Sequence, residues 1–252
     1  MPAGVGAYVL CTTPRTGSTW LCGLLESTGV AGRPASYFRK ADESRYAEQW
    51  GIPRASDGAY GYATFVKAAQ LAGTTDNGVF GARIMWGTLD EVVTRLGTIH
   101  PALRGRDLEL LTSVFGDLRF VHLQRLDSVA QGVSLFRAER SDVWHKTDQL
   151  ERDEEGQEPR YEFDGIDALV RKIEQDNRAW ERWFASVGVR PHPVLYEDLE
   201  SDPVGGTRRI LAFLGLELPP GQQIVGRHER LRDQLSAEWV DRYRTEAGIA
   251  CT

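Results

Sequence analysis

The most constraining feature of this sequence is a run near its beginning, where an apolar segment passes into a turn of small residues and then into an amphipathic segment. The run covers residues 8–21 and reads YVLCTTPRTGSTWL. It predicts a buried strand, a tight loop and a helix. Small side chains at residues 16–19 allow backbone N–H groups to approach an anion at the positive end of that helix. We therefore predict a loop that binds a phosphate group or an isosteric sulfate.

The charged residue of this loop distinguishes it from the phosphate loop of nucleoside triphosphatases. That loop has a lysine after its second glycine and a hydroxyl that binds Mg²⁺. Here Ser18 and Thr19 follow Gly17, and the cation is Arg15, which precedes Thr16. These five residues are predicted to hold the anion without a metal ion. The alternative is an ordinary turn with a surface arginine.

Composition restricts the kinds of partner. The 252 residues suffice for one domain with a substantial core. A net charge of −6 argues against a broad surface for nucleic acid or anionic membrane, so a small-molecule partner is expected. Three cysteines without metal-ligand spacing predict a reducing compartment. With no leader segment and no apolar run long enough to span a membrane, we expect a cytoplasmic protein without membrane insertion.

Strand and helix patterns alternate along the chain. Strands are expected at the start of residues 8–21 and at 79–84, 118–123 and 193–196. Helices are expected at 18–28, 59–72, 88–96, 107–115, 127–138, 166–187, 207–214 and 236–246, with a capping box from Thr88 to Glu91. The acidic segment 146–162 is expected to be a surface loop. This order predicts a single α/β domain, a three-layer sandwich with a mostly parallel central sheet.

A second candidate site follows the strand at 118–123. Arg125 comes just after that strand, Asp127 is placed to cap the next helix, and Ser134 lies about two and a half turns into it. A guanidinium and a hydroxyl in this arrangement can reach one phosphate group. The alternative is an Arg125–Asp127 pair beside a packed serine.

Five segments in one order carry a resemblance to a known family. They are residues 14–19 (PRTGST), 32–38 (GRPASYF), 84–86 (IMW), the Arg125/Ser134 pair and 238–244 (EWVDRYR). Together they resemble the trehalose 2-sulfotransferase-like family, which uses 3′-phosphoadenosine 5′-phosphosulfate (PAPS). The resemblance covers the chain from about residue 7 to residue 244.

The resemblance implies a P-loop-type sulfotransferase fold and a site for PAPS. It assigns the 5′-phosphosulfate group to the loop with Arg15, and the 3′-phosphate to Arg125 and Ser134, with Arg230 as a second cation. It also implies a homodimer, and acceptor-side regions that vary near residues 30–77 and 144–163. Trp239, in the last segment, is expected in the core.

The sequence departs from the family at Ser36, where the family has a glutamate that contacts the acceptor and removes its proton. A neutral serine hydroxyl is a poor base. By resemblance the acceptor lies against residues 32–38, so Arg33, Ser36 and Tyr37 are the predicted acceptor-binding residues. For the base we consider Asp42, Glu43, Glu48, His100 and His122, of which Glu43 and His122 are the chosen candidates.

The predicted function is transfer of a sulfuryl group from PAPS to a hydroxyl of a small molecule, such as a sugar, a glycoside or a secondary metabolite. The second product is adenosine 3′,5′-bisphosphate, and no metal is required. The predicted catalytic residues are Arg15 and either Glu43 or His122. Two alternatives stay open, a P-loop small-molecule kinase and a nucleotide-binding homologue weakened by the loss of glutamate at Ser36.

Overall fold

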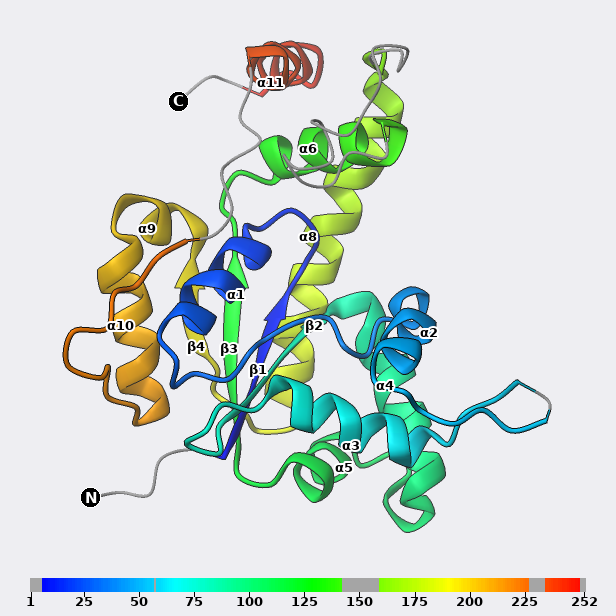
Figure 1. Cartoon of the computed structure of the whole chain (residues 1–252). Coiled ribbons are helices and arrows are strands. Elements are labelled where there is room, and N and C mark those ends of the chain that lie inside the picture. The colour runs from blue at the N-terminus through cyan, green and yellow to red at the C-terminus, as the bar shows by residue number, and fades with distance from the viewer. Residues whose placement is uncertain (1–5, 57, 142–158, 227–233, 250–252) are drawn as a thin grey trace.

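Four parallel strands form the centre of the molecule. The computed structural model describes residues 6–56, 58–141, 159–226 and 234–249 (Figure 1). Its strands are β1 (Ala7–Thr12), β2 (Phe80–Met85), β3 (Leu118–Gln124) and β4 (His192–Leu195), in the order β2-β1-β3-β4. Each neighbouring pair is parallel. The predicted α/β class with a parallel central sheet is confirmed, with strand bounds close to those expected.

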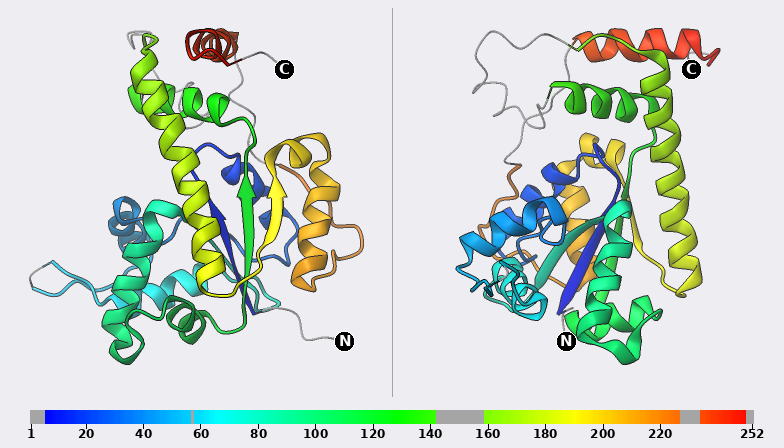
Figure 2. Two further views of the ribbon diagram at one scale, coloured as in Figure 1. Left: turned by 180° about the vertical axis from the view of Figure 1, so that it is seen from behind. Right: turned by 90° about the vertical axis from the view of Figure 1, so that its right-hand side faces the viewer.

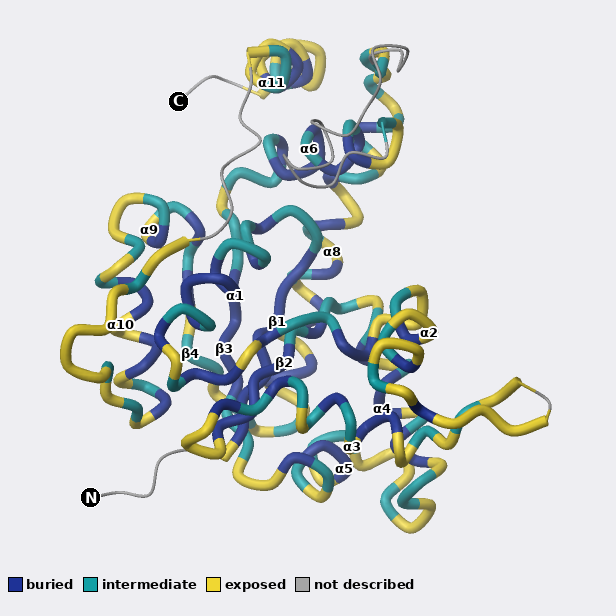
Figure 3. The backbone as a smooth tube through the Cα atoms, viewed as in Figure 1, coloured by how far each residue is buried: buried dark blue, intermediate teal, exposed yellow. Residues whose placement is uncertain are grey.

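The strand β1 is buried along its whole length (Figure 3). Its side chains alternate between the two faces of the sheet. Tyr8 and Leu10 belong to one apolar cluster, whereas Val9 and Cys11 belong to another. Burial on both faces accounts for the continuous apolar sequence of this strand. Because β1 pairs with both β2 and β3, the loop that follows Thr12 lies above the interior of the sheet.

Helices cover both faces and complete three layers (Figure 2). The sheet face that carries the Leu10 side chain packs against apolar side chains of α1 (Ser18–Ser27) and α10 (Pro203–Leu214). The opposite sheet face, which carries the Val9 side chain, packs against four helices. They are α3 (Tyr62–Gly73), α4 (Trp86–Ile99), α5 (Asp107–Phe115) and α8 (Phe163–Ser186). The short helix η1 (Pro101–Leu103) connects α4 to α5.

The helix α8 reaches beyond the carboxyl edge of the sheet. Its carboxyl half places Trp180 in the core against the sheet, and its amino half places Ile166 against α6 (Ser128–Ser141) and α11 (Gln234–Glu246). Figure 1 shows α6 and α11 beyond that edge. One helix thus contributes to two apolar clusters. The single domain over residues 1–252 stays a prediction, and most of the expected loop at 146–162 lies outside the described residues.

The start of α4 differs from the sequence prediction. The helix follows Met85 directly and has no side-chain cap. Thr88 and Glu91 lie inside the helix, so the predicted capping box at its start is wrong. The strand passes into the helix without a connecting loop, and packing of the buried stripe that includes Leu89 fixes where the helix begins. By contrast, α5 has the predicted bounds and ends before Gly116, which has φ 78°.

Besides the short η1, two α-helices among the described residues are absent from the sequence prediction. They are α2 (Lys40–Gln49) and α9 (Tyr196–Ser201). The helix α2 is strongly polar, with only Glu43 and Ala47 buried, so it carries little apolar periodicity. The helix α9 begins at Tyr196, which the sequence assigned to the end of the last strand, because β4 ends at Leu195.

The segment between α1 and β2 runs away from the sheet and back to it, so that its two ends, at Arg33 and Gly73, lie next to each other. The N–H of Arg33 donates to the carbonyl of Gly73 at 2.8 Å, and the N–H of Gly32 donates to the Thr75 hydroxyl at 3.0 Å. The N–H of Arg83, on β2, donates to the carbonyl of Ala35 at 3.0 Å. Helices α2 and α3 lie within this closed excursion, which is held at its two ends and along the edge strand β2.

Candidate functional site

The loop between β1 and α1 is fixed by its own threonines and by two left-handed residues. Arg15 has φ 63° and Gly17 has φ 80°. The hydroxyls of Thr12 and Thr16 are 2.5 Å apart, and Thr16 also donates to the carbonyl of Thr13 at 3.1 Å. The loop is therefore rigid. It leads into α1, whose amino end has no side-chain cap, so the first N–H groups of that helix are not satisfied within it.

Buried polar side chains hold this loop from below. Gln131, on α6, donates to the Thr13 hydroxyl at 2.9 Å and to the carbonyl of Pro14. The indole N–H of Trp180 donates to the carbonyl of Thr12 at 2.9 Å, and Thr13 donates to the amide oxygen of Asn177 at 3.2 Å. Two distant helices, α6 and α8, thus fix the loop, and sequence periodicity identified none of these contacts.

The residues of the two predicted anion sites lie together. The Nε–H of Arg15 donates to the hydroxyl of Ser134 at 3.0 Å. The guanidinium of Arg125 donates to the backbone carbonyl of Arg15 at 3.4 Å. Asp127 caps α6 by accepting from the N–H of Ala130 at 2.9 Å, as predicted. Asp127 forms an ion pair with Arg244 at 3.0 Å rather than the alternative pair with Arg125.

Tyr196 supports both arginine-bearing turns. The guanidinium carbon of Arg125 lies 4.9 Å from the centre of the Tyr196 ring. A Cβ atom at Gly17 would lie 2.6 Å from Cδ2 of the same ring, so only glycine fits there. Glu197 accepts from the N–H of Leu126 at 3.2 Å and so fixes the turn after β3. Tyr196 and Glu197 thus hold the two turns in place.

Arg83 is the important residue that the sequence analysis missed. It lies on β2 opposite Leu10 and extends toward α1. Its Nε–H donates to the hydroxyl of Ser36 at 2.8 Å, and its Nη1 donates to the hydroxyls of Thr19 at 2.8 Å and Ser18 at 3.3 Å. It joins the segment around Ser36 to the loop between β1 and α1. A charged residue inside an otherwise apolar strand was the available signal.

The other predicted acceptor residues occupy different environments. Arg33 is exposed and donates to the carbonyl of Thr74 at 2.5 Å. Tyr37 is buried in a cluster of aromatic rings with Tyr46 and Trp50, and its hydroxyl donates to the carbonyl of Arg33. Burial raises the pKa of the Tyr37 phenol. Contact between these two side chains and an acceptor stays a prediction.

Glu43, a candidate base, is a partner in a buried ion pair. Its side chain is 3% exposed and is paired with Arg95 of α4. The Tyr60 hydroxyl also donates to Glu43, at 2.7 Å. The guanidinium carbon of Arg95 lies 3.8 Å from the centre of the Tyr62 ring. The carboxylate is therefore satisfied by groups that hold α2 and the excursion against α4.

His122, the other candidate base, lies on the opposite face of the sheet from Arg83. It pairs with Cys11 in the register of β1 and β3, and its ring packs against Trp180 and Phe184. Burial lowers the pKa of the imidazole to about 4, so the ring is neutral at pH 7. Its Nε2 atom is buried without a hydrogen-bond partner. The structure does not bring His122 together with Ser36.

The carboxyl-terminal segment is described in part. Arg230 lies outside the described residues. Trp239 is buried against Phe136 and Tyr161, so its predicted place in the core is confirmed. The helix α11 packs on α6, with Tyr243 hydrogen-bonded to Asp167 at 2.8 Å.

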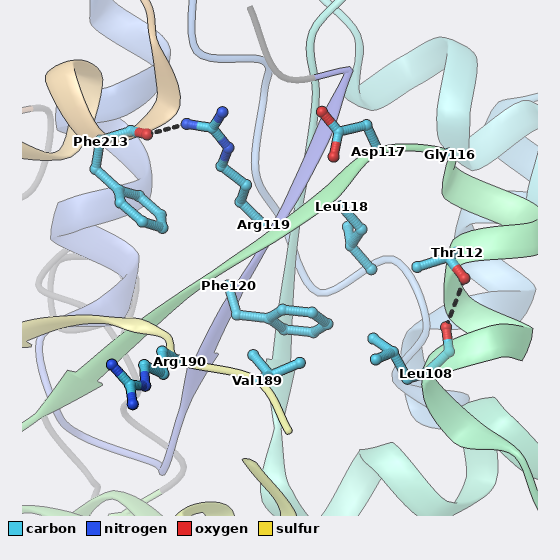
Figure 4. A pocket seen from close by; sticks show the side chains of 10 residues that line it. All are labelled: Leu108, Thr112, Gly116, Asp117, Leu118, Arg119, Phe120, Val189, Arg190 and Phe213. Atoms are coloured by element: carbon cyan, nitrogen blue, oxygen red, sulfur yellow. Dashed lines mark hydrogen bonds between the residues drawn. The ribbon is translucent and has the colours of Figure 1, made fainter. Parts of the chain in front are cut away.

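A pocket at the other end of the sheet is separate from these residues. It has a volume of about 410 Å³ and lies at the amino end of β3 (Figure 4). Arg119 reaches across it to the carbonyl of Phe213. Over the described ranges, no group of three or more His, Cys, Asp and Glu residues is placed to hold a metal ion. Nor is any helix in those ranges long and apolar enough to cross a membrane.

Comparison with known proteins gives the class and then the family. Two curated trehalose 2-sulfotransferases are each 30% identical to this chain. The protein of Mycobacterium tuberculosis (strain ATCC 35801 / TMC 107 / Erdman) aligns over 98% of the chain and 97% of its own length. That of Mycolicibacterium smegmatis (strain ATCC 700084 / mc(2)155) aligns over 96% and 95%. The protein is therefore a sulfotransferase. The profile of the Stf0 sulphotransferase family matches residues 7–246, and the chain belongs to that family.

Solved structures with a similar fold share little sequence. A sulfotransferase domain from the curacin biosynthetic pathway aligns with a TM-score of 0.49 and 12% identity over 99% of both chains. A sulfotransferase domain from the Synechococcus PCC 7002 olefin synthase aligns with a TM-score of 0.47 and 15% identity, over 98% of this chain and 95% of that chain.

Proposed function

We propose that this sulfotransferase transfers the sulfuryl group of PAPS to a hydroxyl of a small-molecule acceptor and releases adenosine 3′,5′-bisphosphate. The observation that carries the proposal is the cluster of Arg15, Ser134 and Arg125 beside the uncapped amino end of α1. Two guanidinium groups, a hydroxyl and backbone N–H groups form a donor set for phosphate and sulfate oxygens. PAPS carries such groups at both its 5′ and 3′ positions.

The residues fit the anionic groups of this donor in their chemistry. Gly17 lets the Tyr196 ring pack directly against the loop, and the ring also supports Arg125. We propose that Arg15 and residues 16–19 bind the 5′-phosphosulfate, that Arg125 and Ser134 bind the 3′-phosphate, and that Arg230 adds a second cation there. When bound, PAPS supplies an activated sulfuryl group. Fixed donors such as Arg15 stabilise charge that develops on oxygen during transfer.

Two earlier candidates for the base are not carried into this proposal. The Glu43 carboxylate is engaged by Arg95 and Tyr60. His122 faces an aromatic cluster across the sheet from Ser36 and Arg83. Each would have to break buried packing to reach an acceptor hydroxyl. The acceptor is proposed to contact Ser36, with Arg33 and Tyr37 nearby in sequence.

Titration calorimetry tests the nature of the donor. We expect adenosine 3′,5′-bisphosphate to bind without a metal ion and more tightly than ATP with Mg²⁺. Tighter binding of ATP with Mg²⁺ would favour a small-molecule kinase. Binding of the bisphosphate without turnover in a broad acceptor screen, read as a sulfate-sized gain in mass, would favour a weakened homologue.

We further propose a cytoplasmic homodimer. The free buried thiols of Cys11 and Cys22 fit a reducing compartment, and the dimer is implied by resemblance to the family. Light scattering coupled to gel filtration measures the mass of the assembly in solution.

A further inference from the structure

Among the residues that the structure describes, no carboxylate forms an ion pair with Arg83. Its side-chain hydrogen bonds go to the hydroxyls of Ser36, Thr19 and Ser18. Across the described ranges, no salt bridge includes this residue. The residue is only partly exposed, on a strand that is otherwise mostly buried. A cation in such a place is costly unless an anion approaches it. Arg83 is therefore suited to meet a negatively charged group.

The same four residues cannot remove a proton. The guanidinium of Arg83 stays protonated in proteins, and the hydroxyls of Ser36, Ser18 and Thr19 are neutral and weakly basic. The thiol of Cys22 is a titratable side chain that senses the Arg83 charge. Burial raises the pKa of that thiol, and the charge of Arg83 lowers it by a smaller amount. An acceptor that reached this group as a neutral alcohol would find no base among these residues.

We propose that the acceptor reacts through an oxygen that is already ionised, as in a phenolate, and that Arg83 is the catalytic residue that binds this oxygen. The inference rests on the proposed function, since it places the acceptor beside the loop that holds the donor. Ser36 orients the guanidinium from the acceptor side, and Thr19 and Ser18 orient it from the loop side. The substrate class is an acidic hydroxyl rather than a neutral sugar hydroxyl.

The transfer step balances without a base in the protein. The acceptor hydroxyl loses its proton to water before it binds. Its oxygen then forms a bond to sulfur, while the bond from sulfur to the bridging oxygen of the donor breaks. The bridging oxygen keeps the electron pair and leaves as the 5′-phosphate of adenosine 3′,5′-bisphosphate. Arg83 stabilises the acceptor oxygen on entry, and Arg15 meets the charge on the departing side.

The test measures ionisation of a bound phenol, independently of turnover. 4-Nitrophenol changes its visible absorbance when it ionises, so it can be titrated with pH in the presence of enzyme saturated with adenosine 3′,5′-bisphosphate. We expect the bound phenol to ionise at lower pH than the free phenol, by about one unit, because an opposite charge within about 4–6 Å favours the anion. This equals a roughly tenfold preference for the phenolate.

Variants identify the source of that preference. Arg83→Met should abolish it and Arg83→Lys should keep part of it, with binding of adenosine 3′,5′-bisphosphate unchanged in both. Ser36→Glu should also abolish it, because a carboxylate beside Arg83 neutralises the charge. Arg119→Met is the matched control, since Arg119 is a partly buried arginine of strand β3 at the other end of the sheet. This control should behave as the unmodified enzyme does.

Three results would overturn the inference. One is an enzyme that binds adenosine 3′,5′-bisphosphate but neither binds phenols nor shifts their ionisation. Another is sulfation of trehalose at a higher kcat/KM than of phenols, with Arg83→Met unchanged. The third is a preference for neutral alcohols that carry a separate carboxylate, if this preference is lost in Arg83→Met. That result would mean that Arg83 binds the carboxylate of the acceptor and not its reacting oxygen. Failure to bind adenosine 3′,5′-bisphosphate at all would instead refute the proposed function, and this inference with it.

Discussion

Arg83 and Arg95 both lie beside the acceptor-side excursion, but they face different partners. Arg95 is 27% exposed and is paired with the buried carboxylate of Glu43. Arg83 is bonded to three hydroxyls. A hydroxyl can give up its place to an incoming anion at small cost, whereas leaving Glu43 buried and unpaired would be expensive. The difference separates a cation that is available to a substrate from one that holds the fold.

The strongest challenge to this distinction concerns Arg15, which we group with Arg83 as a ligand-binding cation. Arg15→Ala should reduce sulfuryl transfer by roughly 10²- to 10³-fold, because removal of one fixed donor to developing charge typically costs that much. Its effect on thermal stability should be small. Turnover with saturating donor, beside a melting curve, measures both. Arg106→Ala is the control, because Arg106 is an exposed arginine whose ion pair is with Glu109 of α5. A folded Arg15→Ala enzyme with normal turnover would contradict the grouping.

Glu43→Gln tests the opposite side of the comparison. Removal of one charge from a buried pair should lower the free energy of unfolding by roughly 3 kcal/mol. Denaturant titration measures this change, with Glu48→Gln as the control, since the Glu48–Arg54 pair is exposed and its loss should change stability by less than about 0.5 kcal/mol. Unchanged stability combined with lost turnover would return Glu43 to the role of base.

Arg125→Ala and Ser134→Ala sharpen the assignment within the donor site. Each should weaken binding of adenosine 3′,5′-bisphosphate by about ten- to a hundredfold, because a hydrogen bond to a charged group contributes roughly 1.5–3 kcal/mol. Binding of adenosine 5′-phosphate should change much less. Ser128→Ala is a control on the same helix, because its hydroxyl is bonded to Glu174. Equal losses for both nucleotides would show that the pair is structural.

His122 gives the smallest effect and appears as a dependence of stability on pH. Its pKa is lowered to about 4 in the fold, from 6.5, so the unfolded chain binds the proton first. The contribution of His122 to the free energy of unfolding is therefore fully present above about pH 6.5 and is lost as the pH falls toward 4. Between about pH 8 and pH 5.5 the free energy of unfolding should fall by roughly 1.4 kcal/mol because of His122.

His122→Phe should remove this part of the slope, and His100→Gln should not. Denaturant titrations at a series of pH values give the comparison. An identical slope in His122→Phe would mean that the imidazole is protonated in the folded protein.

The sequence was sufficient for the sheet and for the anion loop because both depend on local signals. The buried run before Thr13 and the small residues around Gly17 specify a strand, a turn and a helix within one segment. The spacing of a helix was enough to predict that Arg125 and Ser134 lie at the same place, where each is hydrogen-bonded to Arg15, and their binding of one phosphate stays a prediction. The resemblance to a family then supplied the donor.

What the sequence could not provide were contacts between distant segments. Ser36 and Arg83 are 47 positions apart, and their hydrogen bond depends on the return of the excursion to β2. Glu43 reads as a solvated charge on a polar helix until Arg95 is placed against it. His122 reads as a titratable candidate because its position in the strand does not reveal the aromatic rings of α8.

The closed excursion has a consequence for the evolution and engineering of this enzyme. Its ends meet at Arg33 and Gly73, and it is anchored on the edge strand β2. The loop between β1 and α1, by contrast, follows a strand that lies between β2 and β3. A segment with adjacent ends can be exchanged without moving the ends of the chain that flank it. We expect that exchange of residues 33–73 between relatives would change which acceptor the enzyme uses. The residue at position 36, which contacts Arg83, would have to match the charge of the new acceptor.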